Sequence, residues 1–396
     1  MKGVLEMKRL FAAGLSLFLA ASFTCMAAGQ EGIPTAQSAE ATDQKGGTVQ
    51  VTVPVSEDTQ FGSVLMEMSP DEFEESGFQY GDSCNVAFSN GYTMEDLPYY
   101  SGYYAKVNSP LVVGYPMSSN VCIAFCWGDS MWERTGCQPG DTVTVTLAES
   151  GRYADVQDNM DLFYDDDRSD YPDDETFCNF REVRGGNLRP ETLYRGATGV
   201  DNVFGRASYV DSLLEKHGIR CVLNLADDPE EAKAHMDEPD FNSPYYKKLY
   251  DEGNVIAVGL SAAYRQQEFM EKLAGGFRQM LDKEGPFYIH CTEGKDRAGF
   301  VCLLLGALAG SGKEELEADY MKTYDNYFGV SAETDPARYE TVKDLYFEDM
   351  YAWLCSVGQS MDMSIADPQT GARAYLRNGG MTKEEIDAFV ELLASE

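Results

Sequence analysis

The chain has few basic residues: 31 Lys and Arg stand against 66 Asp and Glu in 396 residues, for a formal net charge of −35. Nucleic acids and anionic membrane surfaces attract proteins through clustered Lys and Arg. The shortage of positive charge therefore argues against nucleic acid as a partner and gives no sign of a strong membrane partner.

Long apolar runs, histidine and cysteine are also scarce. Beyond the first thirty residues, no apolar run reaches the ~18 residues needed to span a bilayer. The chain has 3 His, none at metal-ligand spacing from Cys or carboxylates, so we expect no metal and no other cofactor. Its 10 Cys are too few and too irregularly spaced for a disulfide scaffold.

The first residues have the pattern of an export signal. Lys8 and Arg9 precede an apolar stretch at 10–21, and small residues follow up to Ala28. We predict a signal peptide at 1–28 and a small-residue linker at 29–47, which makes the protein secreted or cell-surface. A retained membrane anchor or a lipid on Cys25 stays open, although Phe23 does not fit the pattern that precedes a lipid-modified cysteine.

Residues 48–160 have the pattern of a small β-rich domain of unknown role. Segments 49–53 and 142–146 alternate polar and apolar residues at period two, as half-buried strands do, and Gly-containing turns separate short apolar runs. Four tyrosines here favour core packing over a ligand surface: Tyr99, Tyr100, Tyr103 and Tyr104. Seven of the eleven residues at 165–175 are acidic, so we interpret 161–176 as a solvated linker.

From residue 177 to 396 the pattern becomes that of an α/β domain, a central sheet flanked by helices. Apolar spacing predicts helices at 208–217, 266–281 and 300–309, and buried strands at 219–225, 254–260 and 286–289. The fold class predicted for the whole chain is therefore α/β, preceded by the β-rich domain.

One segment between a buried strand and an apolar helix carries the chemistry. His290-Cys291-Thr292-Glu293-Gly294-Lys295-Asp296-Arg297 has a Cys and an Arg flanking five residues. Loop N–H groups and the helix N-terminus converge there into an anion site, which favours the thiolate of Cys291. Arg297 can grip two phosphate oxygens, and Gly294 lets the backbone approach the ligand. These features indicate a thiolate that attacks phosphorus and forms a phosphocysteine.

This loop resembles that of the bacterial tyrosine phosphatases with an HCxxGKDR loop, members of the Cys-dependent tyrosine and phosphoinositide phosphatase superfamily. Other segments are similar to that family's motifs: N-F-R-E-V-R-G-G at 179–186, L-R-P at 188–190, L-Y-R-G-A at 193–197 and G-I-R-C-V-L-N-L at 218–225. The resemblance covers about half of the chain and does not reach the β-rich domain.

The resemblance implies a phosphoric monoester hydrolase with Cys291 as nucleophile, Arg297 binding phosphate and Asp296 as general acid. Asp227 or Asp228 remain alternative acids, with a helix N-cap as their structural role. Thr292, Glu293, Gly294 and Lys295 would bind the substrate. His290 would orient the loop by hydrogen bonding. Two departures from the family are Ala226, which replaces an Arg, and Ala298, which replaces a hydroxyl residue.

The leading hypothesis is thus an exported phosphatase acting on phosphotyrosine in a phosphorylated protein. A phosphoinositide or inositol phosphate substrate is the first alternative. A sulfurtransferase also uses a Cys in an anion-binding loop, but Gly-Lys-Asp-Arg favours phosphate. Because Ala226 and Ala298 remove two polar groups, a catalytically weak phosphate-binding module is the alternative of another class.

Overall fold

The computed structural model describes residues 48–59, 61–358 and 367–394, which form two compact units divided after Leu162. The predicted signal peptide, Cys25 and the linker at 29–47 lie outside the described residues. No helix in the described ranges is both long and apolar enough to cross a membrane.

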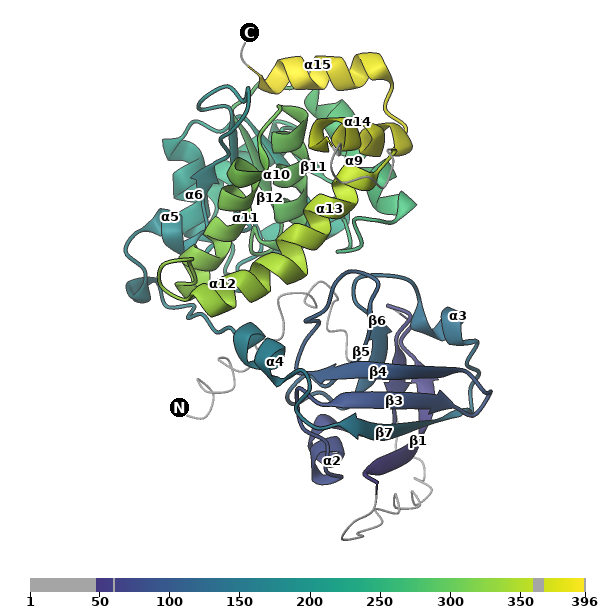
Figure 1. Ribbon diagram of the computed structural model, residues 1–396. Helices are drawn as coiled ribbons and strands as arrows, with labels where there is room; N and C mark the ends of the chain where they lie inside the picture. Colours follow the sequence, from purple (N-terminus) through teal and green to yellow (C-terminus); the bar gives the residue numbers. More distant parts are fainter. Residues whose placement is uncertain (1–47, 60, 359–366, 395–396) are drawn as a thin grey trace. The chain divides into compact units, whose positions relative to one another are not determined.

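The N-terminal unit is a closed barrel with strand order β1-β2-β6-β5-β4-β3-β7 (Figure 1). All neighbouring strands are antiparallel except β4 and β5, which are parallel. The strands are β1 (Gln50–Glu57), β2 (Val64–Met66), β3 (Ser83–Phe88), β4 (Thr93–Tyr100), β5 (Pro110–Val113), β6 (Cys122–Phe125) and β7 (Thr142–Glu149). Its helices are α2 (Pro70–Glu75), α3 (Met131–Thr135) and α4 (Ala154–Met160).

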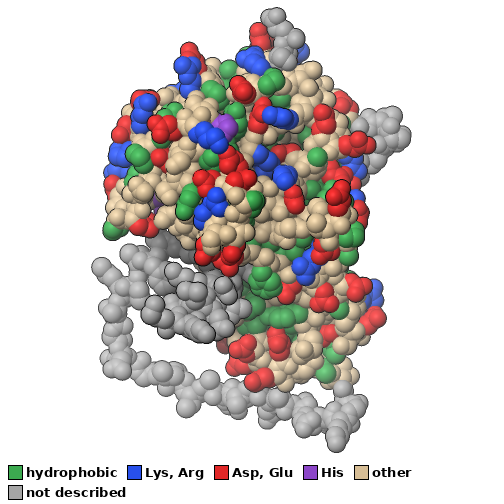
Figure 2. Space-filling model, turned by 90° about the vertical axis from the view of Figure 1, so that its left-hand side faces the viewer, with side chains coloured by type: hydrophobic (Ala, Val, Ile, Leu, Met, Phe, Trp, Pro, Cys, Tyr) green, Lys and Arg blue, Asp and Glu red, His purple; other side chains and the backbone are tan. Residues whose placement is uncertain are grey.

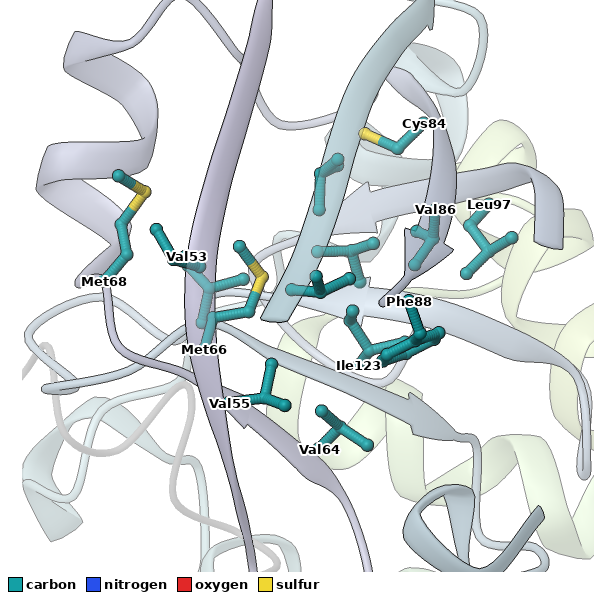
Figure 3. Packing of buried hydrophobic residues seen from close by; sticks show 14 of the residues in the cluster. Val53, Val55, Val64, Met66, Met68, Cys84, Val86, Phe88, Leu97 and Ile123 are labelled. Atoms are coloured by element: carbon teal, nitrogen blue, oxygen red, sulfur yellow. The ribbon is translucent and has the colours of Figure 1, made fainter. Parts of the chain in front are cut away.

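Apolar side chains from most of the strands fill the barrel (Figure 3). Val53 and Val55 of β1 and Val143 and Val145 of β7 are buried, while their neighbours along each strand face outward. The period-two pattern arises because successive strand residues point to opposite faces. The β-rich domain predicted from that pattern is confirmed.

The four tyrosines of the β4 region divide between two apolar clusters of the barrel. Tyr99 is fully buried in the main core, and Tyr100 belongs to a second cluster. Tyr103 and Tyr104 are half-buried and pack against that second cluster. These positions agree with the core-packing interpretation.

The C-terminal unit has a five-stranded sheet in the order β11-β10-β12-β9-β8 (Figure 1). Four strands are parallel, and β8 pairs antiparallel with β9 at the edge. The strands are β8 (Arg181–Glu182), β9 (Leu193–Gly196), β10 (Cys221–Asn224), β11 (Val255–Ala257) and β12 (Phe287–His290). Because β12 is central, its carboxyl end lies where parallel α/β sheets bind ligands.

Helices surround this sheet and confirm the predicted α/β class. They are η1 (Arg168–Asp170), α5 (Asp174–Phe177), α6 (Ala207–Lys216), α7 (Pro229–Met236), α8 (Pro244–Asp251), α9 (Gln267–Met280), α10 (Asp296–Leu308), α11 (Lys313–Phe328), α12 (Pro336–Val342), η2 (the π-helix Lys343–Glu348), α13 (Asp349–Ser356), α14 (Pro368–Asn378) and α15 (Lys383–Leu393). Helix α10 is buried along almost its whole length.

Two segments differ from the sequence-based expectation. Helix α10 begins at Asp296 rather than at residue 300, so Asp296 and Arg297 belong to its first turn. An acidic residue is favourable there because the N-terminal end of a helix is positive. The segment 161–176, expected to be a solvated linker, is partly folded onto the C-terminal unit through η1, α5 and the half-buried Tyr164.

Acidic side chains are spread over the visible face of the molecule (Figure 2). Most carboxylates of the segment 165–175 remain exposed or half-buried, as their hydration requires. The exposed charge agrees with the acidic composition, and on that face Lys and Arg side chains are interspersed with Asp and Glu (Figure 2).

Candidate active site

The loop that leaves β12 holds Cys291 in a tight turn against β9. Cys291 is 3% exposed, and all nine cysteines in the described part of the chain are free thiols. Gly294 has a φ of +70°, and a Cβ at this position would overlap the backbone of Gly196. The loop therefore requires glycine at 294 both for its conformation and for its approach to the sheet.

Five consecutive carbonyl oxygens of this loop accept hydrogen bonds from the surrounding protein. The oxygens of Cys291 and Thr292 accept from His290 Nδ1 at 3.2 Å and from the backbone N–H of Thr198 at 3.0 Å. The next three accept from side chains, in order Tyr327 (2.7 Å to Glu293), Asn179 (3.2 Å to Gly294) and Arg195 (2.7 Å to Gly294 and 3.3 Å to Lys295). The C=O and N–H of a trans peptide point in opposite directions, so these bonds turn the next N–H groups to the other side of the loop. That is the arrangement an anion site needs.

Arg195 is held beneath the loop by a buried ion-pair network. Its side chain is fully buried, and its Nη1 lies 2.6 Å from Asp319 Oδ2. The other oxygen of Asp319 accepts from Arg181 Nε at 3.0 Å. Burial raises the pKa of Asp319, but the two guanidinium groups more than offset this and hold the pKa below its usual value. Asp319 is therefore a shared counter-ion that fixes both arginines.

We expect Asp319→Asn to destabilise the protein by about 3–5 kcal/mol, because it leaves the buried Arg195 and the half-buried Arg181 without their carboxylate. Thermal unfolding and hydrolysis of an aryl phosphate measure the effect on stability and on the loop. Asp387→Asn is the matched control, since Asp387 pairs with half-buried Arg373 and exposed Lys383 near the C-terminus. It should change neither measurement appreciably, and an Asp319→Asn variant as stable as this control would contradict the shared counter-ion role.

His290 precedes Cys291 and is completely buried. Burial lowers its pKa to about 4, so the imidazole is neutral at neutral pH. Its Nδ1 faces the Cys291 carbonyl, which only accepts, so Nδ1 carries the proton and Nε2 accepts from the Tyr246 hydroxyl at 3.2 Å. Asn224 in turn donates to Tyr246 at 3.3 Å. This chain of donors fixes the ring as an orienting group and leaves no free nitrogen to act as a base.

Arg297 lies at the other end of the loop. Its Nη2 donates to Thr292 Oγ1 at 2.9 Å, and its Nη1 donates to the Leu260 carbonyl at 3.1 Å. These contacts hold the guanidinium across the loop, and the Thr292 side chain helps to position it. A planar fork fixed in this way is suited to bidentate contact with phosphate.

Glu293 and Lys295 form a charged pair within the loop. Glu293 is 2% exposed, and its Oε2 lies 3.6 Å from Lys295 Nζ. The same ammonium lies 3.9 Å from Asp296 Oδ2. The other oxygen of the Glu293 carboxylate, Oε1, accepts a hydrogen bond from the Tyr164 hydroxyl. Lys295 is thus within ion-pair distance of both Glu293 and Asp296.

A model of the tyrosine phosphatase family matches residues 175–395. The chain belongs to this family. The match begins after the barrel and spans the whole sheet of the C-terminal unit and the loop that holds Cys291.

Other comparisons find weaker likeness. A search of curated proteins finds no match. An uncharacterized conserved protein from Thermotoga maritima is 18% identical with a TM-score of 0.21, over 28% of this chain and 42% of that chain. The core catalytic domain of the PP-IP phosphatase SIW14 from S. cerevisiae, in complex with citrate, is 16% identical with a TM-score of 0.24, over 43% of this chain and 88% of that chain. The chain covers less than half the length of the first of these structures.

The carboxyl groups considered for proton donation occupy different environments. Asp228 is the N-cap of α7, where its side chain accepts from the N–H groups of Glu230 and Glu231. Asp227 is 3% exposed and accepts from Asn224 at 2.8 Å. Asp296 is in the loop itself, where burial raises its pKa above the usual value. A carboxyl group that keeps its proton at higher pH is suited to act as an acid.

The two alanines that depart from the family are both close-packed. Ala298 is fully buried in α10, and Ala226 is 8% exposed after β10. The Ala226 carbonyl lies 3.5 Å from Arg297 Nη1, so this position contacts Arg297 through its backbone. Among the described residues, no group of three or more His, Cys, Asp and Glu side chains is arranged to hold a metal ion.

Proposed function

We propose that the phosphatase hydrolyses phosphate monoesters through a phosphocysteine at Cys291. The thiolate sulfur attacks phosphorus, the bond to the ester oxygen breaks, and Asp296 gives that oxygen its proton. Water then attacks the phosphocysteine, the Asp296 carboxylate accepts a proton from that water, and phosphate leaves with return of the thiolate. The tethering of five successive loop carbonyls supports this mechanism, because it directs the next N–H groups toward an anion.

Phosphotyrosine in a protein is the substrate that we propose. Besides Arg297, the loop contains the cation Lys295, and its ammonium already lies within 4 Å of both the Glu293 and the Asp296 carboxyl groups. A polyphosphorylated inositol needs further unpaired cations for its additional phosphates. In this loop the positive charge of Lys295 is instead already matched by carboxyl groups, which suits a single phosphate on a neutral aromatic leaving group.

We also propose that the protein is exported, on the basis of the signal-like pattern at 1–28. Its phosphorylated substrates would then lie outside the compartment of synthesis. Fractionation of producing cells, with the N-terminus of the exported chain determined, tests this proposal. Recovery of the whole chain in the cytoplasm alone would contradict it.

A phosphate-release panel tests the substrate class. It contains phosphotyrosine peptides, phosphoserine peptides, phosphoinositides in vesicles and soluble inositol phosphates, each with the wild-type chain and Cys291→Ser. We expect phosphotyrosine peptides to have the highest kcat/KM. A higher value for phosphoinositides or inositol phosphates would replace the proposed substrate, and phosphate binding without release would indicate a phosphate-binding module.

A further inference from the structure

A short acidic segment before the family match lies against the catalytic loop of the C-terminal unit. Its Tyr164 ring stacks on Tyr327 with centroids 5.0 Å apart and an interplanar angle of 20°. It also makes edge contacts with Phe328 at 5.3 Å and Phe204 at 6.4 Å. Tyr164 is therefore enclosed by aromatic side chains from within the same unit.

Arg206 holds this segment in place through contacts with Tyr164 and Asp166. Its guanidinium is 1% exposed and lies 4.8–5.3 Å from the ring centroids of four aromatic residues, Tyr164, Phe177, Phe204 and Tyr327. Its Nη1 lies 3.1 Å from Asp166 Oδ1, two residues after Tyr164, and its Nε donates to the Phe177 carbonyl at 2.8 Å. A buried cation among aromatic faces, paired with a carboxylate, holds the segment in one place.

Two tyrosines contact the same residue of the catalytic loop. The Tyr327 hydroxyl donates to the Glu293 carbonyl at 2.7 Å, and the Tyr164 hydroxyl donates to one oxygen of the Glu293 carboxylate. The second carboxylate oxygen faces Lys295. A buried carboxylate needs donors for its charge, and here Tyr164 supplies one that the loop itself does not contain.

We propose that Tyr164 is a positioning residue of the catalytic loop, which holds the Glu293 carboxylate so that Lys295 also remains close to Asp296. Without the hydroxyl, the charged Glu293 draws Lys295 to itself or turns toward the phosphate site. The first change moves the positive charge of Lys295 away from the phosphate site, and the second brings the negative charge of Glu293 toward it, so both weaken binding of the phosphate dianion. The inference rests on the proposed use of this loop for phosphate hydrolysis.

The test is Tyr164→Phe in the full chain, which keeps the aromatic stack and removes one hydroxyl. We expect KM for a phosphotyrosine peptide, and the inhibition constant of inorganic phosphate, to rise about tenfold, since a hydrogen bond to a buried charge is lost. The value of kcat should fall less than KM rises. Unchanged constants in Tyr164→Phe would overturn the proposal.

A double-variant cycle separates positioning from packing. In a Glu293→Gln background the carboxylate charge is absent, so adding Tyr164→Phe should change KM by less than about twofold. An equal loss in both backgrounds would show that Tyr164 acts through packing alone and would overturn the proposal. Tyr171→Phe is the matched control, because the Tyr171 hydroxyl belongs to the same segment but donates to the Asp165 carbonyl at 2.7 Å. It should leave KM unchanged.

The outcomes of these variants are distinct from failure of the proposed function. If Cys291→Ser retained turnover, the phosphocysteine mechanism would fail whatever Tyr164 does. If Cys291→Ser is inactive and Tyr164→Phe behaves as wild type, the mechanism stands and Tyr164 has no positioning role.

Discussion

Cys291→Ser should abolish phosphate release, with a loss on the order of 10⁵-fold or more, because a serine hydroxyl does not ionise at neutral pH. Binding of inorganic phosphate should remain. None of the hydrogen bonds described above to the loop carbonyls involves the Cys291 side chain, and Arg297 is held by Thr292 and Leu260. Steady-state phosphate release and calorimetric titration with phosphate measure the two properties separately.

The matched control for this substitution is Cys221→Ser, which changes a fully buried thiol on β10. This variant should lose stability while retaining turnover at a temperature where it is folded. Appreciable phosphate release by Cys291→Ser would remove Cys291 from the nucleophile role.

Asp296→Asn should have the second largest effect, and its size should depend on the leaving group. We expect a loss of ~10²–10⁴-fold with a phosphotyrosine peptide, whose phenolate is a poor leaving group. An activated aryl phosphate such as p-nitrophenyl phosphate should lose far less, because its oxygen departs without a proton. Comparing kcat for the two substrates provides the measurement.

The pH profile provides a second readout for Asp296. Burial raises its pKa, Glu293 adds to the rise, and Lys295, Arg297 and Arg195 oppose it. An acid must be protonated to donate, so activity on phosphotyrosine should fall as pH rises through this raised pKa. Tyr320 and Tyr324 also face Asp296, but burial keeps their pKa values above the usual tyrosine range. The alkaline fall should therefore disappear in Asp296→Asn.

Asp228→Asn and Asp227→Asn distinguish the competing acids. Asparagine caps a helix about as well as aspartate, so Asp228→Asn keeps the start of α7 and should retain activity on both substrates. If Asp227→Asn alone showed the loss specific to the poor leaving group, the acid would be Asp227 and not Asp296.

The sequence predicted the strand, loop and helix around Cys291 because their residues are contiguous. A buried strand, a Cys, a Gly and an Arg occur within a few positions, so local chemistry was sufficient to propose an anion site there. The β-barrel strands were found for a similar reason, since alternation of residues such as Val143 and Val145 is a local pattern. The starting position of α10 was missed because an Asp in a first helical turn resembles loop sequence.

The hydrogen bonds and ion pairs that hold the loop were not predicted, because they join residues far apart in the chain. Arg195 and Asp319 are separated by 124 positions, and Tyr164 and Glu293 by 129. Asn179 and Arg195 do lie in segments similar to family motifs, which was a usable signal. Tyr164 gave none, because it adjoins an acidic run whose composition is typical of a solvated linker.

The position of Tyr164 also affects how the catalytic unit is delimited. The family match starts at residue 175, whereas the compact unit starts at Phe163. A fragment cut at the family boundary would contain the entire loop from His290 to Arg297 and lack both Tyr164 and Asp166. Its Glu293 would have lost a donor and Arg206 its carboxylate, so measurements on such a fragment would describe an altered loop environment rather than that of the natural chain.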